Sequence, residues 1–327
     1  MGESAYTGCS RGSWLIFLLC FGAVSRACGG GATPSYLAAQ VYARAANQFA
    51  AAMFFKPAAA TNAGLASQLA PLIIQEVPDK QGSAASLRGV FGNSPSVSDI
   101  PASSFVIRHS SLHSPPGAMN TVPGVDVPQS TVFFAADSVQ FNGHAHARLS
   151  YQWCYSPSHP PGAPPALPRQ GIRITLDSRG RPGVWEVLAD TSGLRLIFVS
   201  QRLEAAAMAE FGKPLPGRRF AIERDLDQAP DVVVPRVIDD GPVAMGPIVY
   251  LSEGTRNVST LICRCMPAQV KQLIATRTFD LTPLEGAVLD AFLATAGTAS
   301  NAPPVLWPAD SHGENGLDHC LRLPAGF

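Results

Sequence analysis

Two histidines one residue apart, His144 and His146, are the clearest candidates for chemistry in this chain of 327 residues. They lie in residues 141–155, where apolar and polar residues alternate as in a β-strand with one buried face. Side chains two positions apart on a strand project from the same face, about 7 Å apart along the chain. Two imidazoles so placed can bind one metal ion, and thiolate ligands beside them would suit Zn²⁺. The alternative interpretation is a solvent-facing strand surface that carries two histidines without any ligand.

A metal site would need further ligands from elsewhere in the chain. The candidates for those ligands are Cys154, Cys263, Cys265 and the cluster Asp318-His319-Cys320.

Cys263 and Cys265 flank Arg264 in a segment that the pattern predicts to be a strand, residues 258–266. As thiolates they could bind metal or take part in redox chemistry. They could equally be two small buried apolar residues, or one of them could be half of a structural disulfide. A direct bridge between the two would be strained, because residues two apart on a strand lie too far apart. The spacing is not that of a C-x-x-C redox motif.

Charge and motif content exclude several classes of function. Lys and Arg number 24 and Asp and Glu number 24, so the formal net charge is zero. A protein that binds nucleic acid normally has a basic excess, and no nucleic-acid partner is expected. The mixed-sign cluster is interpreted as a solvated surface; it comprises Arg218, Arg219, Glu223, Arg224, Asp225 and Asp227. The chain lacks a P-loop, a G-x-S-x-G turn, an H-E-x-x-H helix motif and a G-x-G-x-x-G loop.

The elements that would position these residues are strands with helices between and after them. Residues 35–55 are rich in Ala and have apolar residues at helical spacing, which predicts one peripheral helix. Residues 78–103 are rich in Ser, Gly and Pro and are expected to form a linker. Pro267 is expected to open another helix through residue 275. Ser200 is expected to cap a helix over residues 201–211 that Gly212 ends.

Short apolar runs separated by turn residues predict the remaining strands. Residues 172–176, 184–188 and 194–199 are expected to form a three-stranded meander, with Trp153 and Trp185 in the core. Further strands are expected at residues 105–107, 131–134, 220–223, 232–238, 248–251 and 258–266. Together these elements predict an α+β fold with a largely antiparallel sheet, several helices and an N-terminal helical segment.

The first 27 residues have the order of a secretory signal. Residues 14–24 form the most apolar run of the chain, preceded by Arg11 and followed by small residues. Eleven residues are too few for a membrane-spanning helix, which needs about 20. A short apolar run between a basic segment and small residues is typical of a cleaved signal, with Ser25 and Ala27 as the small residues before the cut.

Cys28 follows that cleavage position and precedes three glycines. This arrangement resembles a bacterial lipoprotein signal, in which the first mature residue is a lipidated Cys on a flexible tether. The lipoprotein pattern has Leu or a similar residue three positions before the Cys, whereas Ser25 stands here, and Arg26 is also unusual. The resemblance implies lipidation at Cys28 and membrane attachment through it. Four cysteines would then remain, and three pairings of them are open.

The sequence therefore predicts a signal peptide in residues 1–27, a helical segment and flexible linker in 28–100, and an α+β domain in 101–327. The expected function is that of an exported structural or binding protein of a cell envelope or periplasm, tethered by lipid. The alternative is a metal-dependent exported enzyme that uses His144 and His146. No other cofactor and no protein partner follows from these residues.

Overall fold

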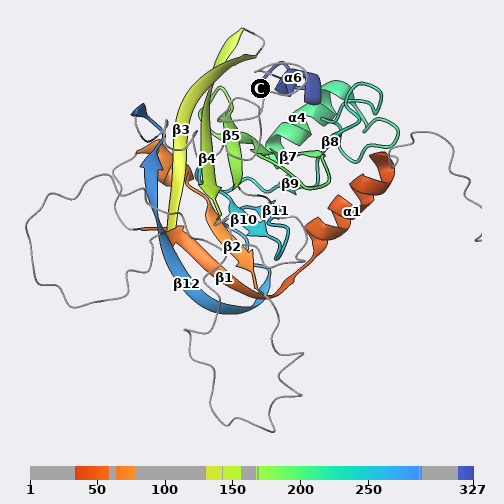
Figure 1. Ribbon diagram of the computed structural model, residues 1–327. Coiled ribbons are helices and arrows are strands. Elements are labelled where there is room, and N and C mark those ends of the chain that lie inside the picture. Colours follow the sequence, from red (N-terminus) through yellow and green to blue (C-terminus); the bar gives the residue numbers. More distant parts are fainter. Residues whose placement is uncertain are drawn as a thin grey trace, which may run out of the picture. The chain divides into compact units, whose positions relative to one another are not determined.

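A curled mixed sheet dominates the computed structural model, which describes residues 34–58, 64–77, 130–141, 143–155, 167, 169–286, 288 and 316–327. Its strands are β1 (Phe49–Pro57), β2 (Leu72–Glu76), β3 (Ser130–Phe141), β4 (His144–Cys154), β5 (Arg169–Leu176), β6 (Pro182–Val187), β7 (Arg195–Ser200), β8 (Val232–Val233), β9 (Val237–Ile238), β10 (Ile248–Leu251), β11 (Val258–Ile262) and β12 (Val270–Pro283). The helices in the described residues are α1 (Pro34–Ala46), α2 (Leu65–Leu69), α4 (Gln201–Phe211) and α6 (Leu317–Cys320). The strand order is β11-β10-β2-β1-β12-β3-β4-β5-β6-β7-β8, and β9 pairs with β7 (Figure 1).

The predicted α+β class with a largely antiparallel sheet and several helices is wrong. The twelve-stranded sheet is mixed and the helices of the described residues are few. Its parallel pairings join β1 to β12, β2 to β10, β3 to β12, and β7 to both β8 and β9. Sequence periodicity identifies strands but carries no signal for which distant strand becomes the neighbour, so the parallel pairings could not be predicted.

The predicted helix over residues 35–55 is also wrong in its second half. Helix α1 ends at Ala46, and the segment that follows is β1, which lies between β2 and β12 inside the sheet. Phe49, Met53 and Phe55 of β1 are buried. Helix propensity is a weak preference that burial of such apolar side chains in a sheet overrides. The predicted linker over 78–103, the strand at 105–107 and the domain boundary near residue 100 lie outside the described residues.

The helix predicted from Pro267 to residue 275 is likewise replaced by a strand. Strand β12 begins at Val270 and pairs in parallel with β1 on one side and β3 on the other. Val270, Ile274 and Thr276 are β-branched residues, which favour a strand over a helix. Strand β1, near the N-terminal end of the described residues, thus pairs with the late strand β12 inside the sheet.

The predicted meander and the helix after it are confirmed. β5, β6 and β7 pair antiparallel in sequence order, and α4 follows directly. The Ser200 hydroxyl accepts a hydrogen bond from the Leu203 backbone N–H, and Gly212 ends the helix with φ of 77°. Such a positive φ is a conformation that glycine adopts at little cost.

The sheet curls so that strands from both ends of its order share one core. This core joins Val249 of β10 and Leu261 of β11 to Trp153 of β4 and Phe198 of β7. Polar contacts link the same ends, since the Gln170 side chain at the start of β5 donates to the carbonyl of Arg256 between β10 and β11. In Figure 1, β10 and β11 accordingly lie beside the β5–β7 strands.

A second core covers the other face of β6 and β7. It contains residues of α4 and of the C-terminal segment, among them Leu203, Leu321 and Phe327. Strand β4 is buried on both faces over its second half: Tyr151 and Trp153 pack in the first core, and Gln152 between them is also buried. Trp153 and Trp185 are core residues as predicted, with 0% and 5% exposure.

Candidate functional site

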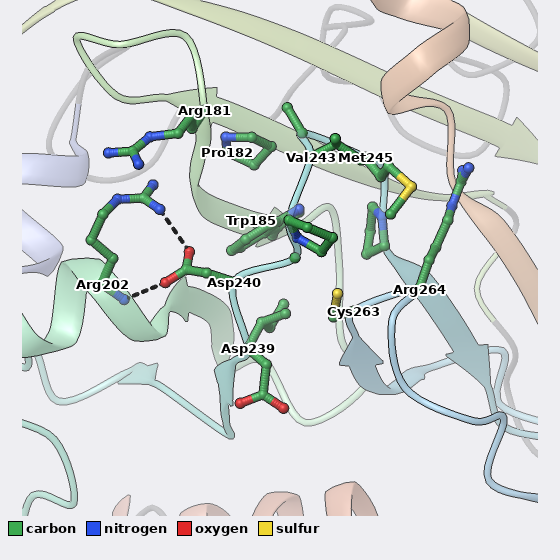
Figure 2. Close-up of a pocket in the computed structure, with 16 residues that line it drawn as sticks. Arg181, Pro182, Trp185, Arg202, Asp239, Asp240, Val243, Met245, Cys263 and Arg264 are labelled. Atoms are coloured by element: carbon green, nitrogen blue, oxygen red, sulfur yellow. Dashed lines mark hydrogen bonds and ion pairs between the residues drawn. The ribbon is translucent and has the colours of Figure 1, made fainter.

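A pocket lies where the concave side of the curled sheet meets the loop before β10, with a volume of about 170 Å³ (Figure 2). Four segments contribute to it: the β5–β6 hairpin, the first turn of α4, the loop of residues 238–247, and the turn after β11. The lining residues are Arg181, Pro182, Trp185, Arg202, residues 238–247, Cys263 and Arg264.

The loop of residues 238–247 is held in place from behind by the segment around α2. The Gln68 side chain donates to the carbonyl of Ala244 at 2.6 Å, and the backbone N–H of Gly246 donates to the carbonyl of Gln68. A Cβ at position 246 would lie 2.2 Å from the Leu69 carbonyl oxygen, so this close approach requires glycine. One wall of the pocket is thereby fixed against the sheet.

The rim of the pocket carries an alternating chain of charges. The Arg202 guanidinium donates to the Asp240 carboxylate at 2.8 Å, and the Arg202 backbone N–H donates to it at 2.7 Å (Figure 2). Arg202 also pairs with Asp177 at 3.1 Å, and Asp177 pairs with Arg181 at 3.2 Å. Partial burial by itself would raise the pKa of Asp177. Hydrogen bonds from two backbone N–H groups and the charges of the two arginines lower it by a larger amount, so the pKa of Asp177 lies below the ordinary value. Asp177 thus keeps both arginines in place as a carboxylate.

Two buried N–H donors in the lining have no hydrogen-bond acceptor within the described part of the chain. They are Nε1 of Trp185 and Nε of Arg264. The Arg264 side chain is anchored at its end, where Nη2 donates to the Ala70 carbonyl, and burial lowers the pKa of its guanidinium. Buried polar groups are normally paired, and each unpaired donor costs free energy. Both donors belong to residues that line the pocket.

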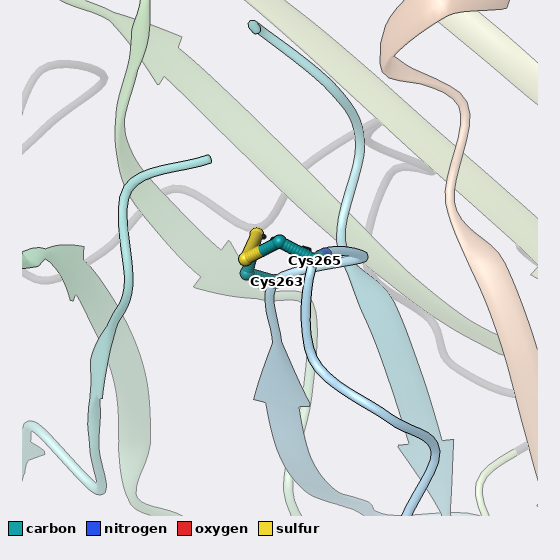
Figure 3. Close-up of a disulfide and its surroundings, with 2 residues drawn as sticks. All are labelled: Cys263 and Cys265. Atoms are coloured by element: carbon teal, nitrogen blue, oxygen red, sulfur yellow. Dashed lines mark hydrogen bonds between the residues drawn. A yellow bond between two sulfur atoms is a disulfide. The ribbon is translucent and has the colours of Figure 1, made fainter. Parts of the chain in front are cut away.

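The wall beside Arg264 contains a disulfide between Cys263 and Cys265 (Figure 3). The expectation that this bridge would be strained rested on a strand over residues 258–266. Strand β11 instead ends at Ile262, and a turn brings the two Cα atoms to 5.2 Å, inside the range of about 4.4–6.8 Å that disulfides span. Cys263 is buried in the pocket wall, whereas Cys265 is exposed.

The two histidines of β4 lie in different environments. His144 is exposed, while His146 is 1% exposed and stacks on the Phe327 ring at 4.8 Å. Nδ1 of His146 lies 2.9 Å from the Leu176 carbonyl oxygen, so that nitrogen donates the hydrogen bond. No three His, Cys, Asp or Glu residues of the described ranges come close enough together to hold a metal ion. Metal binding by the pair stays a prediction.

The remaining candidate metal ligands lie in different environments. Cys154 and Cys320 are thiols outside any disulfide, and burial raises the pKa of Cys154 to about 11. The Sγ atom of Cys320 accepts a hydrogen bond from Arg195 at 3.0 Å, while the side chains of Asp318 and His319 are exposed. Cys28 and the proposed signal peptide lie outside the described residues.

The interpretation of the mixed-sign cluster as a solvated surface is wrong for two of its members. The side chains of Arg218 and Glu223 are 4% and 1% exposed. Glu223 accepts hydrogen bonds from the backbone N–H groups of Arg219, Phe220 and Val234, and burial raises its pKa above the ordinary value. These residues organise the loops between α4 and β8.

Sequence reasoning found only part of the pocket. Cys263, which lies in the lining, is selected by its spacing from Cys265. Trp185, Arg202 and Arg264 had no distinguishing signal, because only the curling of the sheet brings them together.

None of the helices in the described ranges is long and apolar enough to cross a membrane. Comparison of the chain with known protein families, with curated proteins and with solved structures finds no match.

Proposed function

We propose that this protein is an exported binding protein whose pocket takes a small ligand through an acceptor oxygen, a carboxylate or an amide carbonyl. The observation that carries the proposal is the pair of unpartnered donors, Trp185 Nε1 and Arg264 Nε, in the wall of one pocket. A ligand oxygen that accepts from them would satisfy groups that otherwise stay desolvated and unpaired.

The volume and the charges of the pocket limit the ligand further. A pocket of about 170 Å³ is smaller than the roughly 300–1,000 Å³ of sites for drug-sized molecules, so the ligand is small. The lining contains three arginines and two aspartates, and Asp177 pairs with two of those arginines from outside the lining. The site is therefore close to electrically neutral, and recognition depends on hydrogen-bond donors more than on net charge.

Export and lipid tethering belong to the same proposal. Their support is the order of residues 1–31, in which a short apolar run, small residues, Cys28 and three glycines follow one another. Intact-mass analysis of the protein from its native host tests this part. We expect a mature chain that begins at Cys28 with the added mass of acyl chains; a chain that begins at Met1 or Gly2 would refute export.

The binding proposal is tested by following the indole N–H signals of the ¹⁵N-labelled protein while acetate or acetamide is added. Trp185→Phe identifies the Trp185 signal. Trp153 is an internal control, because its Nε1 already donates to the Tyr155 hydroxyl at 2.9 Å. We expect a saturable shift of the Trp185 signal with at least one of the two probes and none for Trp153.

A matched variant, Arg264→Lys, keeps the positive charge but removes the Nε donor. It should weaken binding about tenfold, the effect of roughly 1.4 kcal/mol for one hydrogen bond to a partly buried group. No saturable change of the Trp185 signal with either probe would disprove the proposal. Saturation by acetate alone would show that the ligand is a carboxylate, and saturation by acetamide alone that it is neutral.

A further inference from the structure

We propose that Cys263–Cys265 is an exchangeable disulfide that oxidises a dithiol of a partner molecule through the sulfur of its exposed member, Cys265. The two cysteines differ in access: Cys265 is exposed to solvent, and Cys263 is buried in the wall of the pocket. Thiol–disulfide exchange requires that a thiolate reach one sulfur in line with the bond. Cys265 offers that sulfur, and Cys263 is the leaving group.

The position of the bridge in the chain argues against a role in holding the fold together. It spans a sequence separation of two, so it closes a minimal loop. A disulfide stabilises a fold chiefly by restricting the unfolded chain, and this effect grows with the number of residues in the loop. The bridge also joins no two elements, because both cysteines belong to the single turn between β11 and β12.

The surroundings of Cys263 suit a departing thiolate. The backbone N–H of Cys265 donates a hydrogen bond to the Cys263 Sγ atom at 3.2 Å. Such a donor stabilises the negative charge that the sulfur carries as it departs. The loop of residues 238–247 leaves room for the sulfur at Gly241, where an added Cβ would lie 3.2 Å from Sγ.

The exchange is written as two balanced steps. A partner thiolate attacks Cys265 Sγ, the Cys263–Cys265 bond breaks, a mixed disulfide forms on Cys265, and Cys263 leaves as a thiolate that takes up a proton. The second partner thiolate then attacks the partner sulfur of the mixed disulfide and releases Cys265 as a thiolate. The partner dithiol becomes a disulfide, and the bridge becomes two thiols, with two electrons transferred per chain.

The other cysteines of the described ranges are poorly placed to compete. Burial raises the pKa of Cys154 to about 11. Cys320 is buried, and its Sγ atom accepts a hydrogen bond from Arg195. Among the cysteines of the described ranges the reaction is therefore confined to one pair, and it requires no ligand in the pocket.

The test incubates the oxidised full chain with reduced glutathione, quenches with acid, alkylates free thiols and maps adducts by peptide mass spectrometry. We expect glutathione on Cys265 at least tenfold more often than on Cys263. We also expect dithiothreitol to reduce the bridge in the folded chain at a rate within tenfold of that in denaturant. A structural bridge shielded by the fold would be reduced far more slowly when folded, and that result, or an adduct mainly on Cys263, would overturn the proposal.

Two variants separate the roles of the sulfurs. Reduced Cys263→Ser, which retains Cys265, should take up glutathione from oxidised glutathione at least tenfold faster than reduced Cys265→Ser, which retains the buried Cys263. Cys154→Ser is the matched control and should leave both the adduct position and the reduction rate unchanged. Equal uptake by the first two variants would contradict the assignment of Cys265 as the attacked sulfur.

Discussion

Arg173 of β5 and Glu186 of β6 are direct cross-strand neighbours, and the guanidinium donates two hydrogen bonds of 2.7 Å to the carboxylate. Both side chains are buried, and Arg195 of β7 donates a third bond to Glu186, also at 2.7 Å. The three strands of the meander are thus joined by one buried ionic cluster on the side of the sheet that faces the second core.

Glu186→Gln should destabilise the protein by about 3–5 kcal/mol. It leaves the charges of two buried or half-buried arginines without their carboxylate, which is the costly way to break a buried pair. Denaturant unfolding followed by circular dichroism measures the effect. Asp137→Asn is the matched control, because Asp137 forms a similar two-bond pair with Arg148 but its side chain is 53% exposed. The control should cost less than about 1 kcal/mol; equal losses would show that burial does not set the strength of the first pair.

Acid should weaken the fold through the same carboxylate. Burial acts to raise the pKa of Glu186, but Arg173 and Arg195 outweigh it, so its folded-state pKa lies below the ordinary value. A depressed folded-state pKa contributes stability above the unfolded-state value of about 4.3, and that stability is lost as the pH falls toward the folded-state pKa. Thermal unfolding between pH 7 and pH 3 should show a decline below about pH 4.5. The decline should be shallower in Glu186→Gln, and an identical slope would exclude Glu186 as its source.

Gly246→Ala should destabilise the loop that forms the back of the pocket. The added Cβ would lie 2.2 Å and 2.4 Å from the carbonyl oxygens of Leu69 and Ala70, which belong to backbone and cannot rotate away. Overpacking of this kind costs about 1–3 kcal/mol. Gly326→Ala is the control, because nothing lies within 4 Å of its added Cβ. A melting temperature as high as that of the control would mean that the loop moves freely.

Cys154 should be nearly inert in the folded protein. With its pKa raised to about 11 by burial, its thiolate fraction at pH 8 is on the order of 100-fold below that of an ordinary thiol with a pKa of about 8.5. Peptide-resolved labelling with a maleimide at pH 8 should therefore show a correspondingly slow reaction. Unfolding in denaturant should restore the ordinary rate, and fast labelling of the folded chain would contradict the burial of this thiol.

Deletion of residues 34–57 should abolish cooperative unfolding. This deletion removes α1 and β1, and β1 is the strand that joins β2 to β12 inside the sheet. The shorter deletion of residues 1–33 leaves every described residue in place and is the matched control. A cooperative transition after the longer deletion would show that the rest of the sheet forms without this interior strand.

The sequence by itself determined those helices and strands that are specified by residues close to one another in the chain. Alternation in residues 141–155 identified β4 and the buried face of Trp153, and Ser200 and Gly212 marked both ends of α4. Cap side chains, glycine φ angles and apolar periodicity act within a few residues, and one stretch of chain is enough to recognise them.

Only the tertiary structure decided the mixed sheet and the pocket. Residues 49–57 carry helix formers, yet they form β1 because a place between β2 and β12 buries Phe49, Met53 and Phe55. Trp185 and Arg264 meet in one pocket because the sheet curls and brings β6 near the turn after β11. Pairings and close approaches of this kind depend on the free energy gained when side chains from distant parts of the chain are buried together. That free energy exceeds the small local helix and strand propensities that can be recognised in the sequence.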